Sequence, residues 1–292
     1  MRITDGGMET TLIFKQGFDL PDFASFVLLD DAAGRDALRA YYRSYIDIAE
    51  TRGVGIILDT PTWRANHDWG ERLGYGTEAL ADVNRRAVAM LEELRSPRVV
   101  ISGCIGPRGD GYRVDATMSA EDAEAYHAPQ VETFAETTAD LVTALTLTYA
   151  DEATGIVRAA AAREVSVVIS FTVETDGRLP SGQALDEAIE QVDSETNEAA
   201  AYFMVNCAHP THFADVLEPE PWLERLQGVR ANASKKSHAE LDEAAELDEG
   251  DPVELADRYR ELRDRLPSLS VVGGCCGTDH RHVEAVCAAV TD

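Results

Sequence analysis

Short apolar runs alternate with longer stretches of helical period along the whole chain. Eight runs are rich in Val, Ile and other apolar residues, and they predict β-strands. These runs cover residues 3–6, 54–60, 98–106, 140–148, 166–173, 201–207, 227–234 and 270–276. The stretches between them predict amphipathic helices, for example over residues 35–53, 77–96, 184–200 and 251–266. In the first of these stretches, one face collects Leu38, Tyr41, Tyr42, Tyr45, Ile46 and Ala49.

The alternation of strands and helices predicts a parallel sheet, because each return to a parallel neighbour must cross over through a helix. Eight strands in 292 residues favour an α/β fold of the closed (β/α)8 type, the TIM barrel. A doubly wound open sheet stays open as the alternative, since periodicity does not show whether a sheet closes. No glycine-rich dinucleotide fingerprint follows the first predicted strand, which makes the open sheet the weaker interpretation.

The chain has no internal repeat and no low-complexity linker, so we expect a single domain over residues 1–292. The polar and acidic stretch SKKSHAELDEAAELDEGD, from Ser234, predicts an insertion at about residues 235–250, after the seventh strand. We expect this insertion to form a solvated loop with a short helix and to expose His238. Directly after it, Asp251 predicts the N-cap of a helix with Pro252 in its first turn.

Charge is the strongest feature of the composition. The chain has 26 Lys and Arg against 53 Asp and Glu, a formal net charge of −27. Such a surface repels nucleic acids and anionic membranes, so we expect neither as a partner. No apolar run is long enough to span a bilayer, and the first residues lack the apolar middle of a signal peptide. We therefore expect a cytoplasmic protein.

The basic residues are almost all arginine, with lysine only at positions 15, 235 and 236. An acidic, lysine-poor surface on a folded core indicates adaptation to high salt, where screening relieves self-repulsion. We expect the melting temperature to rise as potassium chloride is added up to molar concentration. A melting temperature that stays flat or falls with added salt would contradict this prediction.

Three of the five cysteines stand where predicted strands end. Cys207 closes one strand, and Cys275 and Cys276 close the last, whereas Cys104 and Cys287 fit core positions. The odd number of cysteines argues against a disulfide framework. Strand ends meet at one rim of a barrel, and three thiolates with an open fourth position suit a catalytic Zn²⁺. Glycines at 273, 274 and 277 would let both adjacent cysteines turn toward one ion. Small core residues are the alternative interpretation.

The sequence motifs around these cysteines resemble those of the homocysteine S-methyltransferases. DGGMETTL near the start, VNC after a buried strand and VVGGCCGTDHRHV near the end occur in the same order and comparable spacing. ILDTPTWRAN and SGCIGPRGDGY are similar to the second- and third-strand motifs of this zinc-dependent family, which includes betaine–homocysteine methyltransferase. The resemblance covers nearly the whole chain. It implies a (β/α)8 barrel with Cys207, Cys275 and Cys276 as zinc ligands and the homocysteine thiol as the exchangeable fourth ligand.

The resemblance also implies further site residues. Asp5, Gly6, Gly7 and Met8 would line the amino-acid end of the homocysteine site, with Asp5 pairing with the substrate ammonium. The alternative for Asp5 is a turn cap. Asp59 and Thr60 match an acid–threonine pair of the family, and Asn206 would orient the neighbouring ligand. The fourth strand departs from the family, because it carries threonine at 146 and 148 where a glutamate is usual.

Three functions stay open at this stage. The first is a zinc-dependent methyltransferase that moves a methyl group from an activated donor to the thiol of homocysteine, or of a related thiol, and so forms methionine. The second is a lyase or hydrolase that uses zinc-bound water, and the third is a non-catalytic zinc- or thiol-binding protein. S-methylmethionine, S-adenosylmethionine, a betaine and a separate methylated corrinoid protein all serve as donors in the broader family. A homo-oligomer is compatible with the sequence. The histidines at 209, 212, 280 and 282 fit loop positions better than metal-ligand positions.

Overall fold

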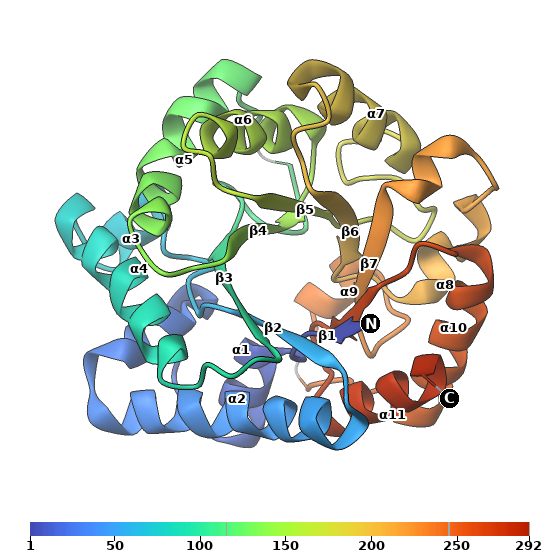
Figure 1. Ribbon diagram of the computed structural model, residues 1–292, viewed down its shortest axis with the longest axis horizontal. Helices are drawn as coiled ribbons and strands as arrows, with labels where there is room; N and C mark the ends of the chain where they lie inside the picture. The colour runs from blue at the N-terminus through green and yellow to red at the C-terminus, as the bar shows by residue number, and fades with distance from the viewer. Residues whose placement is uncertain (115, 245, 292) are drawn as a thin grey trace.

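The computed structural model describes residues 1–114, 116–244 and 246–291; Asp115, Ala245 and Asp292 lie outside the described residues. Eight parallel strands form a closed barrel in chain order, and helices surround it (Figure 1). The barrel closes where β1 pairs with β8, with Arg2 opposite Val271 and Ile3 opposite Val272. The (β/α)8 prediction is therefore confirmed, and the open sheet is excluded.

The strands all overlap the predicted runs. They are β1 (Arg2–Ile3), β2 (Gly55–Asp59), β3 (Val99–Ile105), β4 (Leu141–Leu147), β5 (Val167–Phe171), β6 (Tyr202–Asn206), β7 (Leu226–Ala231) and β8 (Val271–Gly274). The α-helices are α1 (Met8–Thr10), α2 (Ala32–Arg52), α3 (His67–Arg72), α4 (Thr77–Glu92), α5 (Ala120–Ala135), α6 (Ala150–Ala161), α7 (Leu185–Thr196), α8 (Pro210–Phe213), α9 (His238–Asp242), α10 (Pro252–Arg265) and α11 (His280–Thr291). Shorter helical turns are the π-helical η1 (Thr11–Lys15) and the 3₁₀ turns η2 (Pro21–Phe23), η3 (Ser25–Asp30), η4 (Ala214–Val216) and η5 (Pro221–Glu224).

Several predicted strand ends are wrong. β5 ends at Phe171 rather than at residue 173, β7 ends at Ala231 rather than at residue 234, and β8 ends at Gly274, so Cys275 and Cys276 follow this strand rather than close it. β1 ends at Ile3 rather than at residue 6, although the Thr4 amide still donates to Val272 and the Gly274 amide donates to the Asp5 carbonyl. The chain then leaves the barrel at Gly6 to begin α1. Cys207 follows β6 rather than closing it, because its backbone takes a left-handed conformation with φ of 57°.

Capping residues set the ends of the long helices. Asp31 accepts a hydrogen bond from the Gly34 amide at the start of α2, and Gly53 ends this helix with φ of 69°. The predicted cap of α10 is confirmed, since Asp251 accepts from the Val253 amide at 2.8 Å. The buried face of α2 is as predicted except that Ile48, rather than Ile46, is buried.

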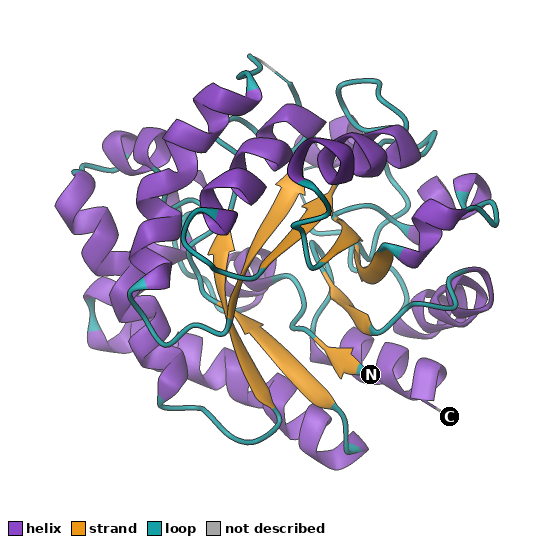
Figure 2. Cartoon of the chain, turned by 45° about the horizontal axis from the view of Figure 1, so that its top comes forward, coloured by secondary structure: helices purple, strands orange, loops and turns teal. Residues whose placement is uncertain are grey.

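The barrel interior has an apolar layer below a polar one. Ile57, Val168, Met204 and Val271 form a buried apolar cluster inside the strands. Side chains alternate between the two faces of a strand, so the side chains two positions further along these strands also point into the barrel. Those positions hold Asp59 on β2, Ser170 on β5 and Asn206 on β6, all buried. The helices surround the strands (Figure 2), and these polar groups lie on the carboxyl-terminal side of the apolar cluster.

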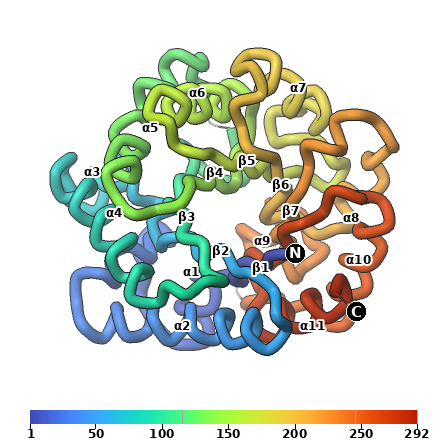
Figure 3. The backbone as a smooth tube through the Cα atoms, viewed as in Figure 1, coloured from blue at the N-terminus to red at the C-terminus, as the bar shows by residue number. Residues whose placement is uncertain are grey.

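The helical ring closes where the barrel closes. α11 packs against both α10 and α2, so the last helix lies beside the first long one (Figure 3). A single hydrophobic core runs between the strands and these helices. None of the described helices combines the length and apolar character needed to cross a membrane.

Candidate active site

Cys207, Cys275 and Cys276 meet at the mouth of the barrel. Their sulfur atoms all lie within 4.8 Å of one another, and the Cys207 and Cys276 sulfurs are 3.5 Å apart. Cys207 reaches this point from β6, and the other two reach it from the end of β8. Within the described part of the chain, this is the only cluster of three or more His, Cys, Asp or Glu with ligand atoms so close. The predicted convergence of the three thiols is therefore what the structure shows.

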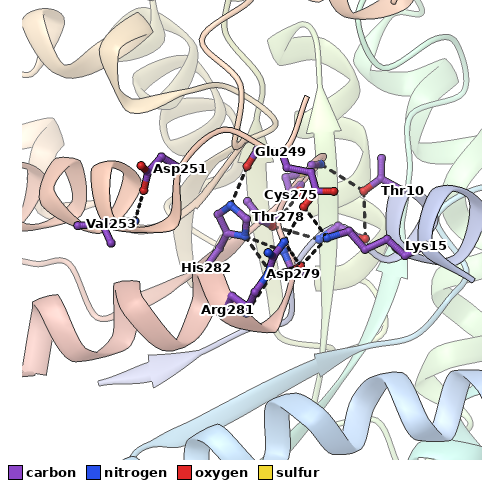
Figure 4. A network of polar contacts seen from close by, with 12 residues as sticks. Thr10, Lys15, Glu249, Asp251, Val253, Cys275, Thr278, Asp279, Arg281 and His282 are labelled. Carbon is purple, nitrogen blue, oxygen red and sulfur yellow. Dashed lines mark hydrogen bonds and ion pairs between the residues drawn. The ribbon is translucent and has the colours of Figure 1, made fainter. Parts of the chain in front are cut away.

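Polar contacts of the residues that follow Cys275 and Cys276 hold this turn in place (Figure 4). Thr278 donates its hydroxyl to the Cys275 carbonyl at 2.7 Å, and Gly277 takes φ of 79° between them. Asp279 then pairs with Lys15 at 2.5 Å and accepts from the Arg281 guanidinium. Burial alone would raise the pKa of Asp279, but hydrogen bonds from His282, Arg281 and Lys15 lower it below its usual value. The GTDH part of the motif thus holds the two cysteines in place.

The glycines of this turn act differently from the sequence prediction. Gly277 has a left-handed backbone, which is the only unusual dihedral angle among the three glycines expected to let the cysteines turn. Gly273 and Gly274 lie at the end of β8, where a Cβ atom would collide with the hydroxyls of Thr4 and Thr278 respectively. The first two glycines are therefore needed for close packing rather than for unusual dihedral angles.

The backbone of Cys207 is held by three hydrogen bonds. Its amide donates to the Arg230 carbonyl at 3.1 Å, and its carbonyl accepts from Asn232 and from His238, both at 2.9 Å. A left-handed conformation costs a non-glycine residue on the order of 1 kcal/mol. These bonds offset that cost and direct the thiol toward Cys276.

Asn206 connects the thiols to the fourth strand. Its amide donates to the Thr146 hydroxyl at 2.8 Å and to the Cys275 sulfur at 3.8 Å, and its oxygen accepts from the Thr146 amide at 2.8 Å. Thr146 has φ of 65° at a break in the β4–β5 register. Thr146, one of the two threonines found where the family usually has a glutamate, therefore lines the cavity with its hydroxyl bonded to Asn206.

A buried arginine joins the two predicted acidic residues. Arg230, from β7, contacts Asp5 at 2.5 Å and also pairs with Asp59. Its Nε donates to the Gly274 carbonyl at 3.2 Å, and Tyr41 donates to Asp5 at 3.1 Å. Burial raises the pKa of Asp59 against the opposing effect of Arg230. Sequence analysis missed Arg230; its signal was a lone charge at an inward position of an apolar strand.

The three thiols are not equivalent. Hydrogen bonds from Cys207 and Cys276 lower the pKa of Cys275 well below its ordinary value, and Arg230 and Asn206 act in the same direction. The pKa of Cys207 is raised because its thiol is the donor in that interaction.

A cavity of about 540 Å³ opens above this group. It is lined by the three cysteines and by every predicted substrate-site residue: Asp5, Gly6, Gly7, Met8, Asp59, Thr60 and Asn206. A Cβ atom on Gly7 would lie 2.6 Å from the Cys275 carbonyl oxygen, so only glycine fits there. Thr60 uses its hydroxyl to accept from the Cys104 amide at 2.8 Å, so it fixes the β3 end.

The segment 235–250 is not simply solvated. It contains the predicted short helix, α9, but Leu241, Asp242 and Leu247 line the cavity. The prediction of an exposed His238 is wrong, because this residue is only 3% exposed. Its ring stacks on Tyr112 at 4.2 Å, and the Tyr112 hydroxyl lies 3.1 Å from the Cys207 sulfur. One face of this polar segment is directed at the barrel mouth.

Glu9 is a further cavity residue that the sequence did not predict, although it belongs to the DGGMET motif. It accepts a hydrogen bond from Ser25 at 2.7 Å, and burial raises its pKa. The other predicted core thiols, Cys104 and Cys287, are buried as expected. His209 and His282 are also buried, and neither belongs to the thiol cluster.

Asp5 predicts a pH dependence of stability. Burial raises the pKa of Asp5 from 3.8 to about 7, against the lowering effect of Arg230. A carboxyl group with a raised pKa takes up a proton on folding, so its contribution to stability falls as pH rises from about 4 to about 7. We expect Asp5→Asn to remove a slope of up to about 1.4 kcal/mol per pH unit in the free energy of unfolding. Denaturant titrations at several pH values measure it.

The exposed Asp19 supplies the control, because Asp19→Asn removes the same charge from the surface. This variant should keep the wild-type slope. An equal slope in wild type and Asp5→Asn would contradict the prediction.

Comparisons with known proteins agree with this geometry. The sequence profile of the family described as homocysteine S-methyltransferase matches residues 2–290. The chain belongs to the homocysteine S-methyltransferase family. A search of curated proteins gives no match.

Solved structures support the fold of this homocysteine S-methyltransferase. The metallated form of the homocysteine methyltransferase MmuM from Escherichia coli is similar at 19% identity and a TM-score of 0.75, over 99% of this chain and 96% of that chain. The oxidised form of the same protein is similar at 20% identity and a TM-score of 0.75, over 99% and 95%. The protein is thus a barrel-fold methyltransferase that acts on homocysteine.

The residues at the barrel mouth fit the metal site that this family implies. Three sulfur donors converge from two strand ends, and each is a soft ligand of the kind that binds transition metals. Asn206 and Tyr112 contact these sulfurs and so restrict where they point. The cavity leaves room on the open side of the cluster for a further ligand.

Proposed function

We propose that the protein transfers a methyl group from a small cationic donor to the thiol of homocysteine, with Cys207, Cys275 and Cys276 holding one Zn²⁺. The observation that carries this proposal is the convergence of three cysteine sulfurs within 4.8 Å at the mouth of a family barrel. Membership of a methyltransferase family does not favour a hydrolase, a lyase or a non-catalytic binding protein. The product of the transfer would be methionine.

When bound, Zn²⁺ would lower the pKa of the substrate thiol, which is near 8.5 for a free cysteine-type thiol, and keep its sulfur nucleophilic. The sulfur would form a bond to the methyl carbon while the bond from that carbon to the donor breaks. The electron pair of the broken bond would stay with the donor, which leaves as a neutral molecule. Asn206 and Tyr112 would hold the cysteine sulfurs in position during this exchange.

The residues near Gly7 would hold the amino-acid end of homocysteine. Gly6 and Gly7 bring bare backbone close to the Cys275 turn, and Met8 lies at the start of α1. Asp5 and Asp59 would offer negative charge to the substrate ammonium, although both already share Arg230. Glu9, whose buried carboxyl group accepts from the Ser25 hydroxyl, is a further acidic residue of the cavity near these two.

The cavity favours a positively charged donor. Asp22, Asp110, Asp242, Glu246 and Asp248 all line it, in addition to the acids near the thiols. Such a lining attracts a sulfonium or quaternary ammonium group and repels anions. The aromatic rings of the same cavity are already engaged, because Trp63 and Trp69 stack on Arg64 and Tyr112 stacks on His238, so the acids carry this preference. We propose that residues 235–250 are an insertion whose acids belong to this lining.

Cys104, Cys207, Cys275 and Cys276 are free thiols. Reduced thiols persist in the cytoplasm, so we propose that the reaction takes place there. A donor carried by a separate corrinoid protein would have to reach the cavity from outside. A methylated corrinoid is therefore included among the donors tested below.

A panel of donors tests the proposed function. Zinc-loaded protein is incubated at high salt with homocysteine and S-methylmethionine, S-adenosylmethionine, a betaine or a methylated corrinoid, and methionine is measured by mass spectrometry. We expect methionine with at least one of the three small cationic donors and none when homoserine replaces homocysteine. Folded, zinc-loaded protein that forms no methionine with any small cationic donor would contradict the proposal.

A further inference from the structure

A second buried arginine lines the cavity and has no carboxylate partner among the described residues. Arg64 lies in the loop that follows β2, and its residue is only 6% exposed. The cavity-lining residues include just one other cation, Arg230, which is neutralised by Asp5 and Asp59. Arg64 is therefore the only cavity-lining cation among the described residues that is free to meet an anionic ligand.

The guanidinium of Arg64 is held in place by stacking, but not all of its hydrogen-bond donors have an acceptor. It stacks on two indole rings, with its Cζ 4.0 Å from the ring centre of Trp63 and 3.7 Å from that of Trp69. One of its terminal nitrogens donates to the Gly109 carbonyl at 3.0 Å. Its Nε is buried and has no hydrogen-bond partner within the described chain. The Nε1 of Trp69 is in the same state, so two cavity-lining residues that stack on each other each carry a buried donor without an acceptor.

The acids nearest to Arg64 are occupied elsewhere. Asp110 accepts from the Tyr112 amide at 2.7 Å, Asp22 pairs with Arg72 at 2.9 Å, and Glu9 accepts from Ser25. Burial lowers the pKa of Arg64 to about 10, which leaves the side chain positively charged at neutral pH. An unpaired buried cation is costly unless a ligand supplies the counter-charge.

We propose that Arg64, with the Trp69 indole N–H beside it, binds the carboxylate of a small zwitterionic substrate. A planar guanidinium fork matches a carboxylate, and the acidic lining of the same cavity would receive the positive end of such a molecule. The many acids disfavour a multiply charged anion such as a phosphate. The identity of the substrates rests on the proposed function, in which both a cationic amino-acid donor and homocysteine carry a carboxylate.

Binding measurements without turnover test this site. Two of the three tryptophans flank Arg64, so in a Trp222→Phe background the fluorescence reports from this wall of the cavity. The ligands are S-methylmethionine and homocysteine, each compared with its decarboxylated counterpart, (3-aminopropyl)dimethylsulfonium and 3-aminopropanethiol. Zinc-loaded protein should bind at least one carboxylate form about tenfold or more tighter than its counterpart, as expected for hydrogen bonds to a charged group.

Arg64→Gln should abolish that preference and leave the affinity for the decarboxylated form within about twofold. The pair that loses its preference identifies whether the donor or the thiol supplies the carboxylate. Arg64→Lys keeps the charge without the fork and should lose at least about threefold, so it serves if the glutamine variant does not fold. Arg72→Gln is the matched control, because Arg72 also lies over Trp69, at 4.6 Å, but is paired with Asp22; it should change nothing.

A carboxylate preference that survives in folded Arg64→Gln, or in Arg64→Lys if the former is unfolded, would overturn the proposal. So would wild-type protein that shows no preference in either pair. If Arg64→Gln loses the preference but the wild-type protein forms no methionine in the donor panel, the methyl-transfer function is refuted and the carboxylate site stands. If the wild-type protein forms methionine but Arg64→Gln keeps the preference, the carboxylate site is refuted and the methyl-transfer function stands.

Discussion

Replacing Cys207 with alanine should empty the metal site and lower methyl transfer by on the order of a thousandfold or more, since a lost Lewis acid is worth several kcal/mol. Two thiols remain in the variant, too few for a three-sulfur site. The fold should survive, because the Cys207 side chain lies at the barrel mouth and outside the main hydrophobic core. Metal content, circular dichroism and methionine formation are measured on the same preparation.

Cys287→Ala is the matched control. It removes a buried thiol from α11 that belongs to the hydrophobic core and not to the cluster. This variant should keep one metal ion per chain and wild-type activity, even if its melting temperature is lower. Full metal content and activity in folded Cys207→Ala would contradict the assignment of the cluster.

Replacing Arg230 with methionine should lower the free energy of unfolding by about 3–5 kcal/mol, the usual result of leaving a buried charge without its partner. Asp5 and Asp59 would then face each other at the barrel mouth with no cation between them. The loss should grow as pH rises above about 4, because both carboxyl groups would have to stay protonated in the folded state. Urea titrations at two pH values measure the effect.

The triple variant Arg230→Met, Asp5→Asn, Asp59→Asn tests the cause. It removes both charges together with the cation and should recover most of the lost stability and all of the added pH dependence. A triple variant as unstable as the single one would show that packing of the arginine side chain, and not its charge, sets the loss.

The sequence predicts the barrel because its strands and helices differ in the period of their apolar positions. It does not predict where a strand stops when hydrogen bonds continue past it, as they do at Thr4 and Asp5 after β1. Nor does period alone decide between Ile46 and Ile48 in α2, since both lie near the edge of the apolar face. Such boundaries depend on which neighbour the element meets in space.

The thiol cluster is predictable because parallel strand ends must meet at one rim. The partners of the cluster are not, because each depends on packing between distant segments. Arg230 is read as a lone charge until Asp5 and Asp59 are brought beside it, and Tyr112 reaches Cys207 from a loop. The polarity of its neighbours predicts that His238 lies in solvent, whereas α9, which begins at His238 after the Ser237 cap, turns the ring onto Tyr112.

The most direct measurement of the central claim is the proton released when homocysteine binds to zinc-loaded protein. A free thiol with a pKa near 8.5 is almost fully protonated at pH 7, so its conversion to a thiolate in the site should release about one proton per chain. Calorimetric titration in buffers of different ionisation enthalpy gives this number, with homoserine and Cys207→Ala as controls that should release none. Release of about one proton by wild type alone is the predicted result, and tight binding of homocysteine without proton release would contradict thiol activation by the three cysteines.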